Sequence, residues 1–374
     1  MSLSILKVGE AKYMESVKKN NFLSERAKKT SERALSADEL KSFGTSNIPF
    51  PKNALIELTS NCNHACVFCA NPRMKRQSSK LDVDFFAKFI SDAVPLGLEE
   101  VGFYTTGEPL MSKNLVEFIK IAKKSDIRYI YITTNGALAS IKKMKLLIDQ
   151  GLNSVKFSIN AASRETYRLI HGKDDFDKVI KNLKDLRSFI DNHNLQVKIL
   201  SSFVVTKQSF HEIEEYKKII GPLVDDYLIL GVKGQSGQSL QQLKELNCSL
   251  TPDYPEEGMA KPCSMLWNRM HLTQEGYLTL CCVDYENDLV YADLNKISLK
   301  KAWNNDIISN MRKRHVDQKL QGTLCHNCLY GKDEKINPIL SIEKTNRKKQ
   351  LSQNGEIDVR KRIEKLNENI NKEI

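Results

Sequence analysis

Long apolar runs are missing from this chain of 374 residues, and glycine and proline are sparse. No stretch reaches the roughly 18 apolar residues that a membrane-spanning helix needs, so we expect no membrane helix. With 17 glycines and 10 prolines, the chain is not a collagen. Charge interrupts residues 1–7 too early for a secretory signal. These absences predict a cytoplasmic protein with no membrane partner.

The composition is that of a globular protein with a basic surface. Hydrophobic residues make up 41% of the chain and charged residues 28%. At roughly 100–200 residues per domain, the length allows two or three domains. The net charge of +11 favours an anionic partner such as a nucleotide or a phosphate. Nucleic acid is not favoured, because the basic residues are scattered and no aromatic patch interleaves with them.

Predicted strands and helices alternate between residues 50 and 232. The strands are 54–59, 101–104, 129–133, 154–159, 197–205 and 227–230, and the helices are 82–94, 114–124, 140–150, 163–170, 176–192 and 211–220. This alternation implies parallel strands joined by right-handed crossovers. Six units fall short of the eight of a closed barrel, so we expect an α/β fold, either a partial (β/α)6 TIM-like barrel or a doubly wound sheet. Both place the ligand site at the C-terminal ends of the strands.

Four regions follow from changes in composition along the chain. They are an N-terminal extension (1–49), the α/β core (50–232), a small α+β domain (233–335) and a charged C-terminal tail (336–374). In the small domain we expect strands at 271–273 and 277–282 and a helix at 298–315. Its apolar content is too low for it to fold alone, so metal bound to its cysteines would stabilise it. In the tail, Ile363, Leu366 and Ile370 form one helical stripe that predicts a helix docked on the body.

Nine cysteines in a reducing compartment indicate metal ligands or catalytic groups rather than disulfides. The first group is Cys62-x-x-x-Cys66-x-x-Cys69, which directly follows the first predicted strand. This spacing lets three thiolates reach three corners of an iron–sulfur cube and leaves one iron open for chemistry. A zinc site would need a fourth ligand, for which His64 is the nearby candidate.

The same motif, with Phe68 before its last cysteine, resembles that of the radical S-adenosylmethionine (SAM) enzymes. Thr106-Gly107-Glu108-Pro109 ends the second strand and resembles the GGEP segment of that family, with Thr106 in place of the first glycine. The segment Ser163-x-x-x-Tyr167-x-x-Ile170-His171-Gly172 is also similar to one found in many members. The resemblance covers about residues 50–330. It implies a core 4Fe–4S cluster on the three cysteines and SAM contacts at Phe68, Thr106, Gly107, Glu108, Pro109, Asn135, Ser158 and Asn160.

The second group, Cys263, Cys281, Cys282, Cys325 and Cys328, resembles the auxiliary-cluster domain of the SPASM/Twitch subfamily. That resemblance implies a second 4Fe–4S cluster on Cys263, Cys281, Cys325 and Cys328. No cysteine follows Cys328, so the shorter Twitch form with one auxiliary cluster is expected. A four-thiolate zinc knuckle is the alternative. Cys282 could replace Cys281, since adjacent strand residues face opposite sides and only one can point at the metal.

In that family the reduced core cluster cleaves SAM, and the resulting 5′-deoxyadenosyl radical takes a hydrogen atom from an unactivated carbon. If the auxiliary cluster accepts the remaining electron, an alcohol carbon becomes a ketone, as in the aminocyclitol dehydrogenases that this chain resembles. If a thiol returns a hydrogen atom to the opposite face, the result is epimerisation, and Cys248 is the spare cysteine for that step. A base could be Lys156, Arg164, His171 or Lys233, and the sequence does not rank them.

The predicted substrate is a small polar or anionic molecule of carbohydrate type, such as a sugar, an aminocyclitol or a nucleotide-sugar. Only about 50 residues precede the first strand, and they lack the alternating pattern of a peptide-recognition module. Two alternatives stay open. One is a peptide-modifying maturase of the RiPP or sulfatase-maturation type, and the other is a non-enzymatic iron–sulfur or zinc protein that binds nucleic acid. The resemblance also implies a flavodoxin or a ferredoxin-like protein as electron donor.

Overall fold

A computed structural model describes residues 44, 47–232, 244–246, 254–342 and 358–368 of the chain. In this described part, no helix combines the length and the apolar character that crossing a membrane requires. Most of the predicted N-terminal extension, the segment 233–243 and Ile370 lie outside the described residues.

One sheet of nine strands, in the order β6-β5-β4-β3-β2-β1-β7-β8-β9, organises the described chain. Strands β1 to β6 pair in parallel, β7 adds in parallel to the other edge of β1, and β8 and β9 follow antiparallel. The strands are β1 (Asn53–Ile56), β2 (Glu100–Phe103), β3 (Tyr129–Thr134), β4 (Ser154–Ser158), β5 (Lys198–Val205), β6 (Asp226–Gly231), β7 (Arg269–Leu272), β8 (Tyr277–Thr279) and β9 (Val290–Asp293).

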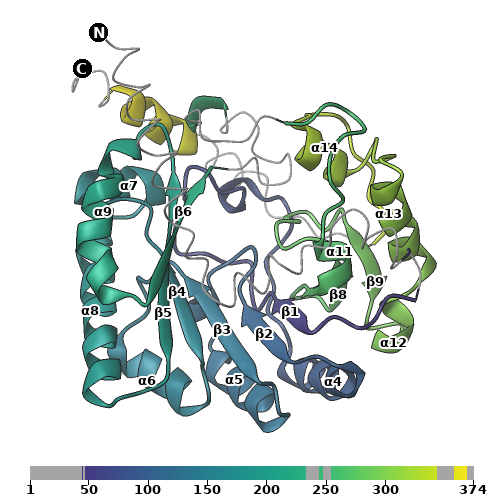
Figure 1. Ribbon diagram of the computed structural model, residues 1–374, viewed down its shortest axis with the longest axis horizontal. Helices are drawn as coiled ribbons and strands as arrows, with labels where there is room; N and C mark the ends of the chain where they lie inside the picture. The colour runs from purple at the N-terminus through teal and green to yellow at the C-terminus, as the bar shows by residue number, and fades with distance from the viewer. Residues whose placement is uncertain (1–43, 45–46, 233–243, 247–253, 343–357, 369–374) are drawn as a thin grey trace.

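Helices cover the outer side of this curved sheet, and the barrel does not close (Figure 1). The α-helices are α4 (Val83–Ala93), α5 (Leu115–Lys124), α6 (Ile141–Asp149), α7 (Arg164–His171), α8 (Phe176–Asn192), α9 (Ile213–Ile220), α11 (Met265–Asn268), α12 (Leu299–Ala302), α13 (Asp306–Val316) and α14 (Leu324–Tyr330). Short 3-10 helices are η1 (Asn71–Arg73), η2 (Val94–Leu96), η3 (Pro109–Met111), η4 (Phe210–Glu212) and η5 (Gly221–Leu223). The predicted α/β class and partial barrel are thus confirmed, and the doubly wound alternative is not.

Helix starts in the core follow local capping chemistry. The side chains of Asp82, Ser140 and Ser163 each accept a hydrogen bond from a backbone N–H of the first turn of α4, α6 and α7. The apolar stripe of α4 then buries Phe86, Phe89 and Ile90 against the sheet. Capping and periodicity together explain why the predicted boundaries of these helices match the structure within one or two residues.

The two faces of the core sheet have different chemistry, because strand side chains alternate. One face, with Ala54, Ile56, Val101 and Phe103, belongs to the main apolar core beneath the helices. The alternate residues line the inner, concave face. There Tyr131 hydrogen-bonds to Asn53 at 2.9 Å, and the Lys156 ammonium lies 5.6 Å from the centre of the Tyr104 ring. The concave face is therefore aromatic and polar, with a cation on β4.

The small C-terminal domain differs from its prediction in three ways. The predicted helix over 298–315 is broken into α12 and α13, because Asn305 leaves the helical conformation and caps α13 by accepting from Ile308 N at 3.0 Å. Strand β9 and helix α14 were not predicted. The predicted hairpin exists as β7 and β8, but it extends the core sheet by pairing with β1 instead of forming a sheet of its own.

The charged tail contains the predicted docked helix. Residues 358–368, here called the C-terminal helix, bury Val359, Ile363 and Leu366 in a cluster with Val67 and Ile170. Arg362 of this helix donates hydrogen bonds to the carbonyls of Leu169 and Ala65. The yellow helix of Figure 1 therefore packs on α7 and on the loop that carries the first cysteine group.

Candidate functional site

The loop after β1 brings Cys62, Cys66 and Cys69 to the C-terminal ends of the parallel strands. All three thiols are half-buried. Backbone bonds from Ala65 N to the His171 carbonyl and from Val67 N to the Ile170 carbonyl, both 2.9 Å, tie the loop to the end of α7. The structure therefore gathers the three predicted ligands in one anchored loop.

Burial shapes the chemistry of these thiols. Burial raises the pKa of Cys62 to about 12, and the nearby Glu108 carboxylate adds to this shift. Burial, followed by the charges of Cys69 and Cys62, raises the pKa of Cys66 well above its usual value. Thiols of this kind are protonated when no metal is bound, so metal binding must release their protons. Ionising these buried thiols without a bound metal would cost free energy. A metal cation that binds the thiolates offsets that cost.

The end of β2 lies against the cysteine loop at Gly107. A side-chain carbon at this glycine would meet the backbone of Thr59, Ser60 and Asn61 at less than van der Waals distance. The neighbouring Glu108 N donates to the Asn61 carbonyl at 2.9 Å, and Asn71 Nδ2 donates to the Thr106 carbonyl at 2.6 Å. The Thr106 hydroxyl donates to the Glu57 carboxylate. The predicted SAM-binding segment is thus a backbone-to-backbone contact between two strand ends, followed by Pro109 at the start of η3.

The carboxylate of Glu108 joins the ends of β2 and β3. This buried carboxylate accepts from Leu110 N at 3.0 Å, Thr134 Oγ1 at 2.7 Å and Asn135 N at 2.8 Å. Burial raises the pKa of Glu108, and these hydrogen bonds oppose the rise. Asn135 then donates through Nδ2 to Asn63 Oδ1 at 2.8 Å and lies 4.0 Å from Cys62 Sγ. Glu108 and Asn135 therefore connect β2 and β3 to the cysteine loop.

Ser158 and Asn160, at the end of β4, differ in accessibility. Ser158 is half-buried, and its hydroxyl accepts from Asn160 Nδ2 at 3.4 Å. Asn160 is fully buried, and its Oδ1 accepts from Val204 N at 2.8 Å. The backbone N–H of Asn160 donates to His171 Nε2 at 3.2 Å. These contacts make Asn160 a structural link between β4, β5 and α7, whereas Ser158 has an accessible side chain.

The second cysteine group converges from three segments of the C-terminal domain. Burial, then the charges of Cys263 and Cys328, raises the pKa of Cys325, which lies on α14 with Cys328. The pKa of Cys281 is raised by a hydrogen bond with Cys282, by burial, and by the charges of Cys263 and Cys328. The four predicted auxiliary ligands therefore lie near one another.

Cys282 has other neighbours. The hydrogen bond from Cys281, then His271 and Arg269, lowers the pKa of the Cys282 thiol. The charges of Cys263 and Cys328 add to the rise in the pKa of Cys281, the residue that the SPASM/Twitch resemblance implies as the ligand.

Neither cysteine group has the geometry of a single-ion site. Among the described residues, the one group whose ligand atoms all lie within 4.8 Å is His64, Cys66 and His171. Thiolates around one tetrahedral zinc, at about 2.3 Å each, would be roughly 3.8 Å apart. The wider spacing of the all-thiolate groups fits a multi-iron cluster, the group that thiolate sets of this kind hold.

Comparison with known proteins agrees with this chemistry. The model of the radical SAM superfamily matches residues 56–220, and the model of the SPASM iron–sulfur cluster-binding domain matches residues 263–329. The chain is a radical SAM protein with a SPASM domain. Its cofactors are therefore SAM and 4Fe–4S clusters, in the core and in the auxiliary domain.

Relatives of known name match part of the radical SAM protein. It is 34% identical to the GTP 3′,8-cyclase of Chlorobaculum tepidum over 132 residues, 35% of this chain and 39% of that one. It is 34% identical to a probable GTP 3′,8-cyclase of Saccharolobus islandicus over 164 residues, 43% of this chain and 50% of that one. The chain thus spans half or less of the length of these curated relatives.

Solved structures share the fold of the radical SAM protein at low identity. BtrN in complex with AdoMet and 2-DOIA is 18% identical with a TM-score of 0.51, over 76% of this chain and 96% of that one. Streptococcus suis SuiB bound to precursor peptide SuiA is 18% identical with a TM-score of 0.57, over 78% of this chain and 72% of that one.

Tyr285 connects the two domains of the radical SAM protein. The sequence analysis did not predict this contact. Its hydroxyl lies 3.3 Å from Cys69 Sγ, and its ring packs with Ala70 and Met74. Tyr285 comes from the segment directly after Cys281 and Cys282. Its place in sequence, three residues after the double cysteine, was the available signal.

The second missed feature is a buried ion-pair group. The Arg76 guanidinium pairs with Glu57 at 2.7 Å and with Glu275 at 2.7 Å. Glu57 Oε2 also accepts from Gln274 N at 3.1 Å. This group joins the end of β1 to the turn between β7 and β8, so it joins the radical SAM core to the SPASM domain.

Three of the four candidate bases lie in the described part of the chain, each in a different environment. Arg164 is exposed and pairs with Asp174 at 2.8 Å, and His171 is fully buried behind Cys66. Lys156 is half-buried on the concave face beside Tyr104. Lys233 lies outside the described residues, as does Cys248.

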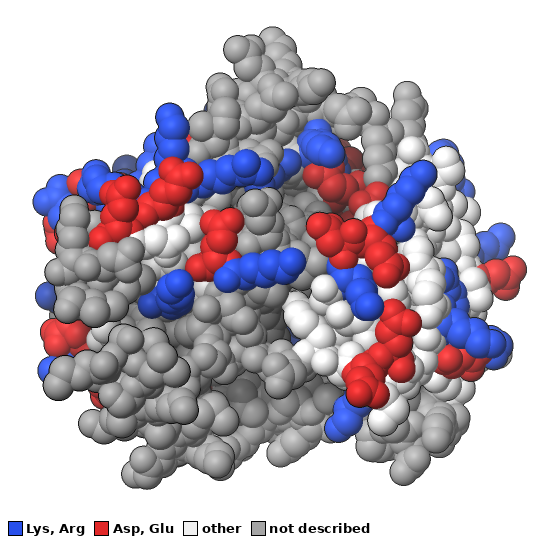
Figure 2. Space-filling view, turned by 90° about the horizontal axis from the view of Figure 1, so that it is seen from above, with Lys and Arg blue, Asp and Glu red and all other residues white. Residues whose placement is uncertain are grey.

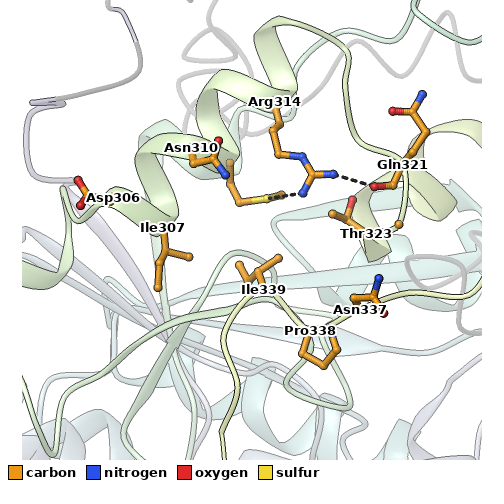
Figure 3. A pocket seen from close by; sticks show the side chains of 11 residues that line it. Asp306, Ile307, Asn310, Arg314, Gln321, Thr323, Asn337, Pro338 and Ile339 are labelled. Carbon is orange, nitrogen blue, oxygen red and sulfur yellow. Dashed lines mark hydrogen bonds between the residues drawn. The ribbon is translucent and has the colours of Figure 1, made fainter.

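A surface pocket of about 510 Å³ lies elsewhere, between α13 and residues 337–339 (Figure 3). Arg314 crosses it and donates to the Gln321 carbonyl at 2.7 Å and toward Met311 Sδ. No sequence-predicted site residue lines this pocket.

Proposed function

We propose that the chain is a radical SAM enzyme that oxidises an alcohol carbon of a small, anionic, carbohydrate-like substrate, or epimerises it. Cys62, Cys66 and Cys69 would hold the core cluster, and Cys263, Cys281, Cys325 and Cys328 the auxiliary cluster. When bound, the core cluster and SAM together supply a carbon radical strong enough to remove a hydrogen atom from an unactivated carbon. A flavodoxin or a ferredoxin-like protein would deliver the electron.

The residues at the strand ends would bind and orient SAM. Gly107 lets the backbone of β2 approach the cysteine loop, and Glu108 and Asn135 lock that backbone in place. Ser158 offers an accessible hydroxyl on the next strand, and Phe68 packs beside the loop. Holding two reactants in a fixed geometry is a large part of what an enzyme of this kind contributes.

The concave face supports a polar, anionic substrate. Lys156 of β4 offers a cation beside the ring of Tyr104, which directly follows β2. A phosphate or carboxylate fits a lysine, and a sugar or nucleoside ring fits an aromatic wall. Partial similarity to GTP 3′,8-cyclases, whose name specifies a nucleotide, is in keeping with this class.

The observation that carries the proposal is the contact between Tyr285 and Cys69. Through it, the segment bearing Cys281 reaches the core cysteine loop directly, so the two cysteine groups are joined by packed protein. An electron left on the substrate would have a route through packed protein to the auxiliary cluster. This arrangement favours oxidation over epimerisation.

The first test is anaerobic reconstitution with iron and sulfide, followed by dithionite and SAM. We expect about eight irons per chain and formation of 5′-deoxyadenosine. Cys66→Ala should lose about four irons and all SAM cleavage, and Cys325→Ala should lose about four irons but keep SAM cleavage. Cys282→Ala is the matched control and should keep all eight. A reconstituted wild-type protein that leaves SAM intact would refute the enzyme proposal.

A second candidate is a peptide-modifying maturase, favoured by the structural likeness to SuiB in its complex with the precursor peptide SuiA. Lys156→Met separates the two candidates. It should weaken turnover of phosphorylated sugars or nucleotides at least tenfold, whereas turnover of a peptide that uses backbone recognition would be little affected. Nucleic acid is not favoured, because basic and acidic side chains are interspersed on the described part of the face that Figure 2 shows.

A further inference from the structure

Behind Cys66 lies a buried chain of polar groups that the proposed reaction does not use. His171 Nδ1 is 3.6 Å from Cys66 Sγ and 3.3 Å from His64 Nδ1. His64 Nε2 lies 3.2 Å from a carboxylate oxygen of Asp175. The His171 side chain is fully buried, and Tyr167 stacks on its ring at 4.0 Å.

Hydrogen bonds at the far ends of this chain determine where the protons lie. The Asn160 backbone N–H can only donate, so His171 Nε2 must accept and carries no proton. A neutral His171 therefore has its proton on Nδ1. His64 Nε2 must donate to Asp175, so a neutral His64 has a bare Nδ1. The His171 Nδ1–H is then a donor aimed between His64 Nδ1 and Cys66 Sγ.

This proton arrangement argues against a single metal ion held by His64, Cys66 and His171, although their ligand atoms lie within 4.8 Å. Such an ion would occupy Nδ1 of both histidines. His171 Nε2 would then carry the proton of the neutral ring and would point it at the Asn160 N–H, two donors 3.2 Å apart. The backbone of Asn160 is covalently fixed as a donor, so the conflict has no local solution.

We infer that His171 is a positioning residue that donates a hydrogen bond from Nδ1 to the sulfur of Cys66 when this cysteine is a cluster ligand. The inference rests on the proposed role of Cys66. One-electron reduction adds negative charge around that sulfur, and a fixed N–H donor stabilises the added charge. Hydrogen bonds to ligand sulfurs are among the factors that set the potential of iron–sulfur sites. His171 would therefore make the core site easier to reduce.

The test is an electron paramagnetic resonance titration of the reconstituted full-length protein with dithionite, following the signal that changes when SAM is added. His171→Leu removes the donor. It should lower the equilibrium constant for reduction about tenfold, a shift of about 59 mV to more negative potential for one electron. His171→Asn places an amide N–H near the position of Nδ1 and should restore most of the wild-type potential. Tyr167→Phe keeps the stacked ring and is the packing control, with wild-type potential expected.

A potential for His171→Leu equal to that of the wild type, with full iron content, would overturn the inference. A common shift in His171→Leu, His171→Asn and Tyr167→Phe would also overturn it, because packing alone would then explain the effect. If His171→Leu does not assemble its iron, His171→Gln replaces it. Its amide reaches toward Asn160 rather than Cys66, so it should be harder to reduce than His171→Asn. A wild-type protein with no SAM-sensitive signal would instead refute the proposed function itself.

Discussion

Gly107, after the end of β2, lies directly against the backbone that follows β1. Its missing side chain lets the backbone of 59–61 lie against it, and the loop with Cys62 begins directly there. Any side chain at this position must push two strand ends apart. The position is therefore sensitive to a single methyl group.

We expect Gly107→Ala to destabilise the protein by about 1–3 kcal/mol, because the added carbon overlaps backbone that cannot rotate away. It should also weaken SAM binding. Urea unfolding and equilibrium binding of SAM to the reconstituted protein measure the two effects. Gly221→Ala is the matched control, since its added carbon would meet nothing closer than 3.9 Å. Equal behaviour of the two variants would contradict this reading of the close approach.

Residues with a local signature could be predicted from the sequence, and residues defined by long-range contact could not. Cys62, Cys66 and Cys69 serve one site from a single loop, so their spacing carries the signal. Tyr285 meets Cys69 across 216 positions of sequence, and no short pattern encodes such a contact. Asn160 stays a prediction as a SAM contact, and its hydrogen bonds with His171 and Val204 are long-range contacts of the kind that no short pattern encodes.

Among the elements, the C-terminal helix packs directly against the loop that carries the first cysteine group. It covers the cysteine loop with Val359, Ile363 and Leu366, and its Arg362 binds the carbonyls of Ala65 and Leu169 at 2.5 and 3.0 Å. These carbonyls belong to the loop and to α7, the two segments that also meet at Cys66 and His171. The helix thus clamps together the parts that position Cys66.

Arg362→Ala should release this clamp. Two hydrogen bonds from a charged donor are lost, which weakens docking by about 1–3 kcal/mol. We expect faster loss of core iron to a chelator and faster proteolysis of the tail. Lys365→Ala, at an exposed position of the same helix, should behave as the wild type. Iron loss at the wild-type rate in Arg362→Ala would mean that the clamp has no part in holding the loop.

The helices and strands of the core could be predicted because capping residues, helical periodicity and strand alternation all indicate the same elements there. In the C-terminal domain these three signals do not agree. Asn305 interrupts an otherwise helical run, and a break at one residue is hard to distinguish from a tolerated polar residue inside a helix. Strand β9 has four residues and α14 has seven, lengths at which periodicity gives little information. The parallel pairing of β7 with β1 is a long-range contact that no local sequence pattern indicates.

At the scale of the whole molecule, Arg76 joins the two domains. Its guanidinium is buried between Glu57 of the core and Glu275 of the C-terminal domain. A buried pair is weak evidence for stability in itself, but removing one partner leaves the others charged and without a counter-ion. The domains should therefore unfold together.

Arg76→Met should cost about 3–5 kcal/mol, because it leaves two carboxylates without their cation. Urea unfolding followed by circular dichroism should change from one transition toward two. Arg128→Met is the matched control. Its pair with Glu99 is 3.6 Å long with an exposed arginine, so its loss should cost no more than about 1 kcal/mol. A similar cost for both variants would show that the buried group does not couple the domains.

The position of β1 in the sheet also has a consequence for synthesis. β1 is the first described strand to leave the ribosome, yet it pairs on one side with β7, which is made roughly 200 residues later. At about 5–20 residues per second, that edge waits about 10–40 s for its partner. An unpaired strand edge is prone to pair with other chains. The nascent core therefore passes through a vulnerable interval, during which its cysteine loop also lacks Tyr285.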